Sequence, residues 1–113
     1  MCHAIMAEEL HDAEFINTWT NVTVEELRTH LAEYTPEWAE KISGMSAVDI
    51  RRIAIEFAKA APAVTTMCNR GSSAHLNGYY NDRAIQLLNA IVGSVGKKGG
   101  WCWSPWGSRV DTL

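Results

Sequence analysis

The chain has few of the residues from which a function is usually assigned, beginning with cysteine. Its three cysteines stand at positions 2, 68 and 102, and none of them forms a C-x-x-C pair with another. An odd number at this spacing excludes a disulfide framework and matches no zinc-ligand pattern. A single cysteine at the end of an apolar run, such as Cys68, is more often a small buried hydrophobe than a nucleophile. We therefore predict no metal ligand and no catalytic residue in this chain.

The chain also lacks an excess of charge of one sign. Lys and Arg number 10 and Asp and Glu 13, for a net charge of −3, and there is no run of basic residues. Proteins that bind nucleic acid cluster Lys and Arg to neutralise phosphates, so this balance argues against nucleic acid as a partner. With 47% hydrophobic and 20% charged residues, the composition is that of a folded globular segment.

Long apolar runs are missing as well. A membrane-spanning helix needs about 18 or more consecutive apolar residues, and no stretch of this chain supplies them. The first six residues lack the basic start and apolar core of a secretion signal. We therefore expect no membrane span and no leader here, and the cellular location is left open.

What the first 61 residues do contain is a series of helix signals. Residues that cap helices precede stretches with apolar residues at helical spacing, and these caps are Asp12, Thr23, Thr35 and Ser46. Pro36 suits a first helical position, and Gly44 marks the end of that helix. In the helix that follows Ser46, a buried face is predicted at Ile50, Ile53, Ala54 and Phe57. We expect residues 1–61 to be a helical segment.

Residues 62–113 are predicted to form a β-loop-α unit with a Trp-rich tail. The β-branched Val64, Thr65 and Thr66 predict a strand over 63–67. A polar loop follows, and then a helix from about Tyr80 to Val95, which Gly96 closes. Its apolar stripe, including Leu87, Leu88, Ile91 and Val95, is expected to pack against the strand and against the face at Ile50, Ile53 and Phe57. The predicted fold class is α/β, with both segments in one compact unit.

The polar loop between the strand and the helix is the candidate site. In this layout backbone N–H groups and a helix N-terminus can face the phosphates of a nucleotide-like cofactor. Arg70 would be the bidentate partner of such an anion, with His75 and Asn77 nearby. No established phosphate-binding motif is present. The alternative is an ordinary solvated connection in which Gly71 and Gly78 supply turns.

The order of motifs resembles a known family. The pattern RG…H-x-NG…RAI-x-x-LNA-x-x-G-x-x-G-x-x-GG extends from Arg70 to Gly100, preceded by YTPEWAEKISGMSAVDIRRIAIEFAKAAPAV at 34–64 and EELHDAEFINTWT at 8–20. In this order they resemble the catalytic subunit of molybdopterin oxidoreductases, which carry a bis(molybdopterin guanine dinucleotide) metal centre. Thiosulfate, polysulfide, tetrathionate and dimethyl sulfoxide reductases are such enzymes. The chain is too short for a whole subunit and lacks the cysteine cluster of an iron–sulfur centre, so the resemblance implies an internal fragment.

The resemblance carries several expectations. The fragment would belong to a larger dinucleotide-binding-like domain pair and contribute a loop near the pterin dinucleotide. The cofactor-binding residues would be Arg70, Gly71, Ser72, His75, Asn77 and Gly78. The parent enzyme would use molybdenum or tungsten for two-electron chemistry in the periplasm or the cytoplasm. The isolated chain is expected to hold no cofactor and to be inactive.

The end of the chain suggests a partner. Three of its five tryptophans stand in WCWSPW at 101–106, and such a cluster indicates an apolar surface that another surface covers. The partner would be the remainder of the catalytic subunit or a second copy in a homo-oligomer, through the tryptophans or the edge of the strand at 63–67. The alternative function is a small non-catalytic helical interaction domain that uses this Trp-rich end.

Overall fold

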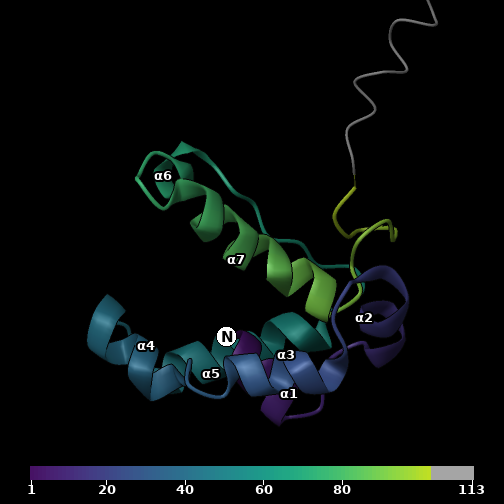
Figure 1. Ribbon diagram of the computed structural model, residues 1–113, viewed down its shortest axis with the longest axis horizontal. Helices are drawn as coiled ribbons and strands as arrows, with labels where there is room; N and C mark the ends of the chain where they lie inside the picture. Colours follow the sequence, from purple (N-terminus) through teal and green to yellow (C-terminus); the bar gives the residue numbers. More distant parts are fainter. Residues whose placement is uncertain (103–113) are drawn as a thin grey trace, which may run out of the picture.

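The structure is a computed structural model that describes residues 1–102. The described helices are α1 (Cys2–Ala7), α2 (Ala13–Trp19), α3 (Val24–Leu31), α4 (Pro36–Ser43), α5 (Ala47–Lys59), α6 (Arg70–Ser73) and α7 (Gly78–Ile91). Figure 1 shows α7 as an arm that rises away from the group of α1, α3, α4 and α5, with α6 at its far end and α2 near its base. Most of the Trp-rich cluster, including Trp103 and Trp106, lies outside the described residues.

The prediction of an α/β fold is wrong, because the described residues form helices and no strand. Residues 63–67, expected to be the strand, are irregular and run alongside α7 (Figure 1). A strand needs a neighbouring strand for its backbone N–H and C=O groups. Here the backbone N–H of Thr66 donates instead to the side chain of Asn89, at 2.8 Å. β-branched residues favour a strand only where such a neighbour exists.

The helix starts predicted in the first half are confirmed. The side-chain oxygens of Asp12, Thr23, Thr35 and Ser46 each accept the backbone N–H three residues on, at 2.8, 3.2, 3.1 and 3.1 Å. Each bond satisfies one of the N–H groups that a helix start leaves without an intrahelical partner. Gly44 ends α4 in the left-handed conformation, with φ 74°. The helical first half therefore follows from local sequence signals.

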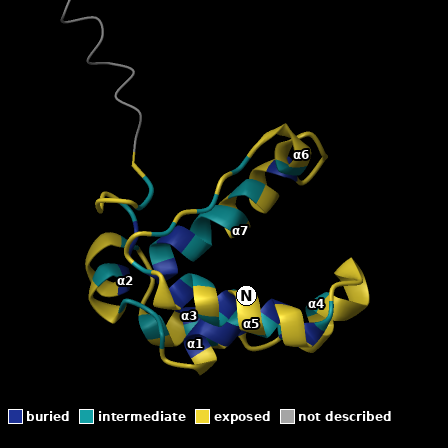
Figure 2. Cartoon of the chain, turned by 180° about the vertical axis from the view of Figure 1, so that it is seen from behind, coloured by how far each residue is buried: buried dark blue, intermediate teal, exposed yellow. Residues whose placement is uncertain are grey.

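The core forms around α1, which packs against α3, α5 and α7. Its Ile5 and Met6 are buried with Ile16 of α2, Ala54 of α5 and Ile91 of α7. Figure 2 shows these buried segments where the base of the α7 arm meets the other helices. A helix as short as α1 is marginal in isolation, so its packing in the core stabilises it.

The last helix differs from its predicted bounds at both ends. α7 begins at Gly78 and ends at Ile91, earlier than the predicted 80–95. Gly93, with φ 63°, follows its end, so Gly96 does not close it. A β-carbon on Gly93 would lie 2.2 Å from the Asp12 carboxylate, so the chain turns here where Asp12 passes closely.

The predicted packing of this helix is also corrected. Apart from α6 at its start, α7 packs against α1 and α2 rather than against the α5 face. On α5, Ile50 and Ala54 are buried, but Ile53 is 36% exposed. On α7, Ile91 is completely buried, while Leu88 is only half-buried.

The exposure of these two α7 residues predicts the effect of truncating each. Ile91→Ala is expected to lower the free energy of unfolding by about 2–5 kcal/mol, because Ile91 is completely buried in the core cluster. Leu88→Ala should cost clearly less, since part of its side chain already contacts water. Urea denaturation of the full chain, followed by circular dichroism, measures both. Equal losses would show that Leu88 belongs to the core as well.

Three helix-start carboxylates predict how stability depends on pH. The Thr23 backbone N–H and hydroxyl lower the pKa of Glu26. Backbone and Arg51 hydrogen bonds lower the pKa of Glu37, and the Ser46 hydroxyl and Arg52 lower that of Asp49. A carboxyl group whose pKa is lower in the folded than in the unfolded protein stabilises the fold at pH values above its unfolded pKa. That stabilisation is lost as the pH falls through the pKa of the folded state. We expect the midpoint temperature of thermal unfolding to fall slightly between about pH 5 and pH 3. In Glu26→Gln the midpoint temperature should depend less on pH over this range.

Candidate functional site

The polar loop of residues 69–78 lies at the far end of α7, away from the core (Figure 1). It contains α6, which packs against α7. Nearly every residue of the loop is exposed, as Figure 2 shows at this tip. The loop is therefore presented by the end of a helix whose base is anchored in the core.

Asn89 holds the segment that precedes the loop against α7 by hydrogen bonds to Thr66. This residue is completely buried although it is polar. Its Oδ1 accepts the backbone N–H of Thr66 at 2.8 Å, and its Nδ2 donates to Thr66 Oγ1 at 2.8 Å and to Gln86 Oε1 at 2.7 Å. The Thr66 hydroxyl in turn donates to the carbonyl oxygen of Ile85, at 3.1 Å. Because both groups of the Asn89 amide are satisfied, its burial is compatible with a stable fold, and the segment has one defined position.

A second group of contacts fixes the loop nearer its tip. The Cys68 thiol donates to the carbonyl oxygen of Asp82 at 3.6 Å and accepts from Gln86 Nε2 at 3.4 Å. The Ser72 hydroxyl donates to the Asp82 carboxylate. Asn81 Nδ2 donates to the carbonyl oxygen of Ser72 at 3.2 Å. These contacts hold α6 against the first turns of α7.

Of the six predicted site residues, Ser72 and Gly78 make the contacts that hold the loop against α7. Ser72 bonds to Asp82. Gly78 is buried, and a β-carbon there would lie 1.9 Å from the carbonyl oxygen of Ser73. Only glycine allows the loop backbone to approach the start of α7 so closely. Both residues therefore determine the shape of the loop.

The other four, Arg70, Gly71, His75 and Asn77, are exposed at the tip. The guanidinium of Arg70 forms no ion pair within residues 1–102. A β-carbon on Gly71 would have no atom within 4 Å. Asn77 precedes α7, and its side chain makes no capping bond there. A cation without a partner, an open backbone and an uncapped helix start fit an anionic group, so these residues are compatible with the phosphates of a dinucleotide.

Asn89 is a positioning residue to which sequence reasoning gave no role. It appears within the LNA motif of the resemblance, but its contact with Thr66 joins residues that are distant in the sequence. Helical spacing did not indicate its burial, because Asn89 falls about 100° around the helix from Leu88, beside the apolar stripe rather than within it. Its burial follows from the segment at 64–68 that covers this side of α7, where the Asn89 amide finds its hydrogen-bond partners.

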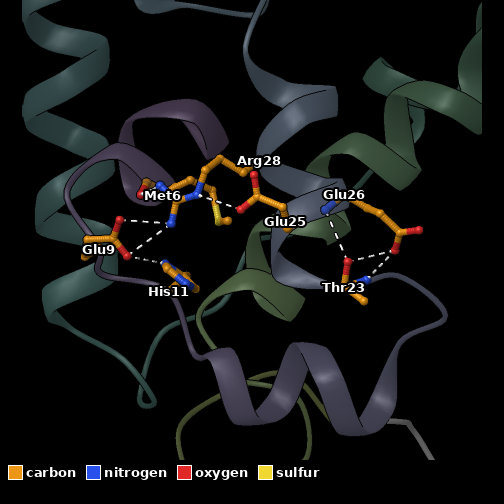
Figure 3. A network of polar contacts seen from close by, with 7 residues as sticks. All are labelled: Met6, Glu9, His11, Thr23, Glu25, Glu26 and Arg28. Atoms are coloured by element: carbon orange, nitrogen blue, oxygen red, sulfur yellow. Dashed lines mark hydrogen bonds and ion pairs between the residues drawn. The ribbon is translucent and has the colours of Figure 1, made fainter.

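A second polar cluster lies between the end of α1 and α3, drawn in Figure 3. Arg28 donates from Nη1 to the carbonyl oxygen of Met6 at 3.2 Å and pairs with the Glu9 carboxylate at 2.9 Å. His11 Nδ1 lies 3.9 Å from the same carboxylate, too far for a hydrogen bond. Glu9 has a positive φ of 54°, where the chain turns out of α1. The cluster ties α1 to α3, and its charged groups are already paired.

The described part of the chain holds neither a metal-ligand cluster nor a membrane-spanning helix. No three His, Cys, Asp or Glu side chains within residues 1–102 are grouped so that they could hold a metal ion. None of the described helices has the length and apolar character needed to cross a membrane.

Comparison with known proteins identifies relatives of this chain. No protein-family model matches it. It is 38% identical over 86 residues to the arsenate respiratory reductase molybdopterin-containing subunit of Shewanella sp. (strain ANA-3), over 76% of this chain and 10% of that protein. It is 38% identical over 98 residues to the probable oxidoreductase YoaE of Bacillus subtilis, over 87% of this chain and 14% of that protein.

A third relative has a different substrate in its name. The chain is 31% identical over 100 residues to the thiosulfate reductase molybdopterin-containing subunit PhsA of Salmonella typhimurium, over 88% of this chain and 13% of that protein. The chain thus spans 10–14% of the length of these three relatives. The resemblance in motif order is confirmed, and the chain belongs to the molybdopterin oxidoreductase family, in which it corresponds to a short part of a catalytic subunit.

Proposed function

We propose that this chain supplies a molybdopterin oxidoreductase catalytic subunit with a loop beside its pterin cofactor, the loop at 69–78. The observation that carries the proposal is the tip of this loop. Arg70 has no ion-pair partner among the described residues, and the backbone at Gly71 is open. An exposed guanidinium beside an open backbone suits a bound phosphate, because it offers a fork of donors and room for close approach.

The relatives support a role with the cofactor rather than with a substrate. One is named for arsenate and another for thiosulfate, and both are named as molybdopterin-containing subunits. Most of this chain matches both of them. A segment shared by enzymes that act on different substrates is better suited to bind what these enzymes have in common, which is the molybdopterin cofactor.

Each loop residue has a proposed role. Arg70 neutralises a phosphate of the guanine dinucleotide, Gly71 lets the backbone approach it, and His75 and Asn77 offer hydrogen bonds. Ser72 and Gly78 hold the loop in the shape that this needs. When bound, the pterin with its molybdenum or tungsten supplies two-electron chemistry. The residues of this chain bind and orient the cofactor.

Guanosine diphosphate and inorganic pyrophosphate test the site. The full chain, labelled with nitrogen-15, is titrated with each while backbone amide shifts are followed by NMR. We expect the amide shift changes to be concentrated at residues 69–79. Binding should be weak, with a Kd on the order of 1 mM, because the rest of the subunit is absent. Arg70→Gln should weaken binding by about tenfold or more, since a charge-assisted hydrogen bond is lost.

Arg83→Gln is the matched control. It removes the same charge from the neighbouring helix, where the Arg83 guanidinium lies 5.5 Å from the Tyr79 ring centroid. This variant should bind both probes almost as well as the parent chain. If the two variants weaken binding equally, or if the shifts lie outside the loop, the proposed contact is wrong. Tighter binding of guanosine diphosphate than of pyrophosphate would indicate that the chain also contacts the nucleoside.

Exposed apolar side chains support a covering partner, which we propose to be the rest of the catalytic subunit. On α4 and α5 they include Ile42, 67% exposed, and Val48, 74% exposed. Trp38 and Met45 are exposed in the same region. Several exposed large apolar side chains on two helices that pack together are characteristic of an interface. In the isolated chain, a second copy would cover them.

Self-association of the isolated chain is therefore a testable outcome. Light scattering at micromolar concentration should give a mass above the 12.6 kDa of one chain. The double variant Ile42→Lys with Val48→Lys should shift the protein to monomer, because two charges enter the apolar surface. Ser43→Lys, an exposed polar position on the same helix, should leave the mass unchanged. A monomeric parent chain under these conditions would contradict the homo-oligomer.

A further inference from the structure

Cys68 and Cys102 line the same pocket. Its volume is about 320 Å³, and its wall also includes Thr66, Gln86 and Gly100. It lies where the segment that enters the polar loop passes the turn that follows α7. Both residues are free thiols. Two sulfur nucleophiles that are distant in the sequence thus face one small space.

The backbone on either side of this pocket is held in close contact. A β-carbon on Gly99 would lie 2.9 Å from the β-carbon of Ala63, and one on Gly100 would lie 2.9 Å from the carbonyl oxygen of Pro62. The backbone N–H of Trp101 donates to the carbonyl oxygen of Ser94 at 3.1 Å. The two segments therefore start out side by side and lead into the pocket from the same end.

The two thiols differ in a way that suits a stepwise reaction. Cys102 is exposed, so a reagent in solution can reach it. Cys68 is half-buried, and its sulfur is oriented by Gln86 and by the carbonyl oxygen of Asp82. Cys2 stands apart in α1, where burial raises the pKa of its thiol. A raised pKa leaves less thiolate, which is the reactive form.

We propose that Cys68 and Cys102 are an oxidisable pair that forms an intramolecular disulfide by exchange with a small disulfide such as oxidised glutathione. The Cys102 thiolate attacks one glutathione sulfur, which forms a mixed disulfide and releases one glutathione thiolate. The Cys68 thiolate then attacks the Cys102 sulfur, which closes the protein disulfide and releases the second. The two thiol protons pass to the two released thiolates. Two electrons from the protein thiols reduce the glutathione disulfide.

Closure requires Cys102 to move. The Cα atoms of a disulfide usually lie about 4.4–6.8 Å apart, so Cys102 crosses the pocket towards Cys68. The change in backbone angles falls at Cys102 itself, because the backbone of Trp101 before it is held by hydrogen bonds with Gly96 and Ser94. The disulfide would withdraw Cys68 from its bonds to Asp82 and Gln86, one residue before the polar loop. It would thereby couple the position of that loop to the redox state. The disulfide itself does not depend on the function proposed for the loop.

Peptide mapping tests the pair. The full chain is incubated with oxidised glutathione, the remaining thiols are alkylated, and the protein is digested with trypsin. Cleavage after Lys59, Arg70, Lys98 and Arg109 places Cys68 in peptide 60–70 and Cys102 in peptide 99–109. We expect these two peptides joined as the main product, while Cys2 is alkylated. In urea the yield of the joined peptides should fall at least about tenfold relative to that of mixed disulfides. The pocket is lost there, and only the tether of the unfolded chain keeps the two cysteines near each other.

Variants separate this pair from general thiol oxidation. Cys2→Ser should leave the joined product unchanged. Cys102→Ser should abolish it and leave Cys68 largely unmodified, since the accessible thiol is gone. Hydrogen exchange of amides 69–78 should differ between the oxidised and reduced parent chain. Three results would each overturn the proposal: glutathione on both Cys68 and Cys102, pairing of Cys2 as often as of Cys68, or an equal yield in urea.

Discussion

Gly78→Ala is expected to lower the free energy of unfolding by about 3 kcal/mol and to separate the polar loop from α7. The added β-carbon would lie 1.9 Å from the carbonyl oxygen of Ser73 and 2.5 Å from its carbon. Both atoms are backbone, so no side-chain rotation relieves the overlap. Either α6 moves away from α7 or the start of the helix unwinds. Urea denaturation and the amide spectrum of residues 69–82 would record the two effects.

Gly71→Ala is the matched control in the same loop. A β-carbon at this position would have no atom within 4 Å, and the residue lies in α6. We expect no loss, or a gain of about 0.4–1 kcal/mol, because alanine restricts the unfolded chain. If Gly78→Ala is as harmless as Gly71→Ala, the close packing of the loop on α7 is incorrect.

The Gly71→Ala variant also provides a second test of the cofactor proposal. Its fold should be intact, but the methyl group would occupy the open space in which a phosphate is proposed to approach. Weaker binding of guanosine diphosphate without loss of stability would support that approach. Unchanged binding would mean that Gly71 is not part of the contact.

Asn89→Leu is expected to cost about 3 kcal/mol in stability, although leucine and asparagine are similar in size. The substitution leaves the backbone N–H of Thr66 and the side-chain oxygen of Gln86 without the partners that Asn89 now provides. A polar group that loses its partner away from water costs about 1–3 kcal/mol, and the groups of Thr66 and Gln86 are half-buried. Hydrogen exchange at Thr66 should accelerate more than exchange in α5, because the segment before the loop is released from α7.

Asn81→Leu is the control for this substitution. It makes the same chemical change on the same helix, but Asn81 is exposed and loses only its bond to the carbonyl oxygen of Ser72. Its cost should be below about 1 kcal/mol. Equal losses in the two variants would mean that burial of Asn89 does not set the cost, and the proposed anchoring of the loop would be wrong.

The candidate site was only partly predictable from the sequence. Arg70, Gly71, His75 and Asn77 could be selected because polar residues and glycine gather in a connection between predicted elements. The structure shows them exposed together at one tip, while their contact with a cofactor stays a prediction. Asn89 could not be assigned from the sequence, because its role depends on Thr66, which local pattern does not bring near it.

The packing of α7 illustrates the same limit. Helical spacing identified an apolar stripe on this helix, yet spacing does not say which helix the stripe meets. Leu88 and Ile91 belong to the same stripe, but only Ile91 is completely buried. Ile91 lies inside the core cluster, whereas Leu88 packs against that cluster and is only partly covered by it.

The sequence by itself determined the features that depend on neighbours a few residues away, together with the family. Asp12, Thr23, Thr35 and Ser46 cap their helices because each bond spans three residues, and the order of motifs identified the molybdopterin oxidoreductases. Tertiary structure alone decided the state of residues 63–67. Their β-branched composition suits a strand, but their backbone meets the side chain of Asn89 rather than another strand. A strand is a property of a pair of segments, so one segment's sequence could not decide it.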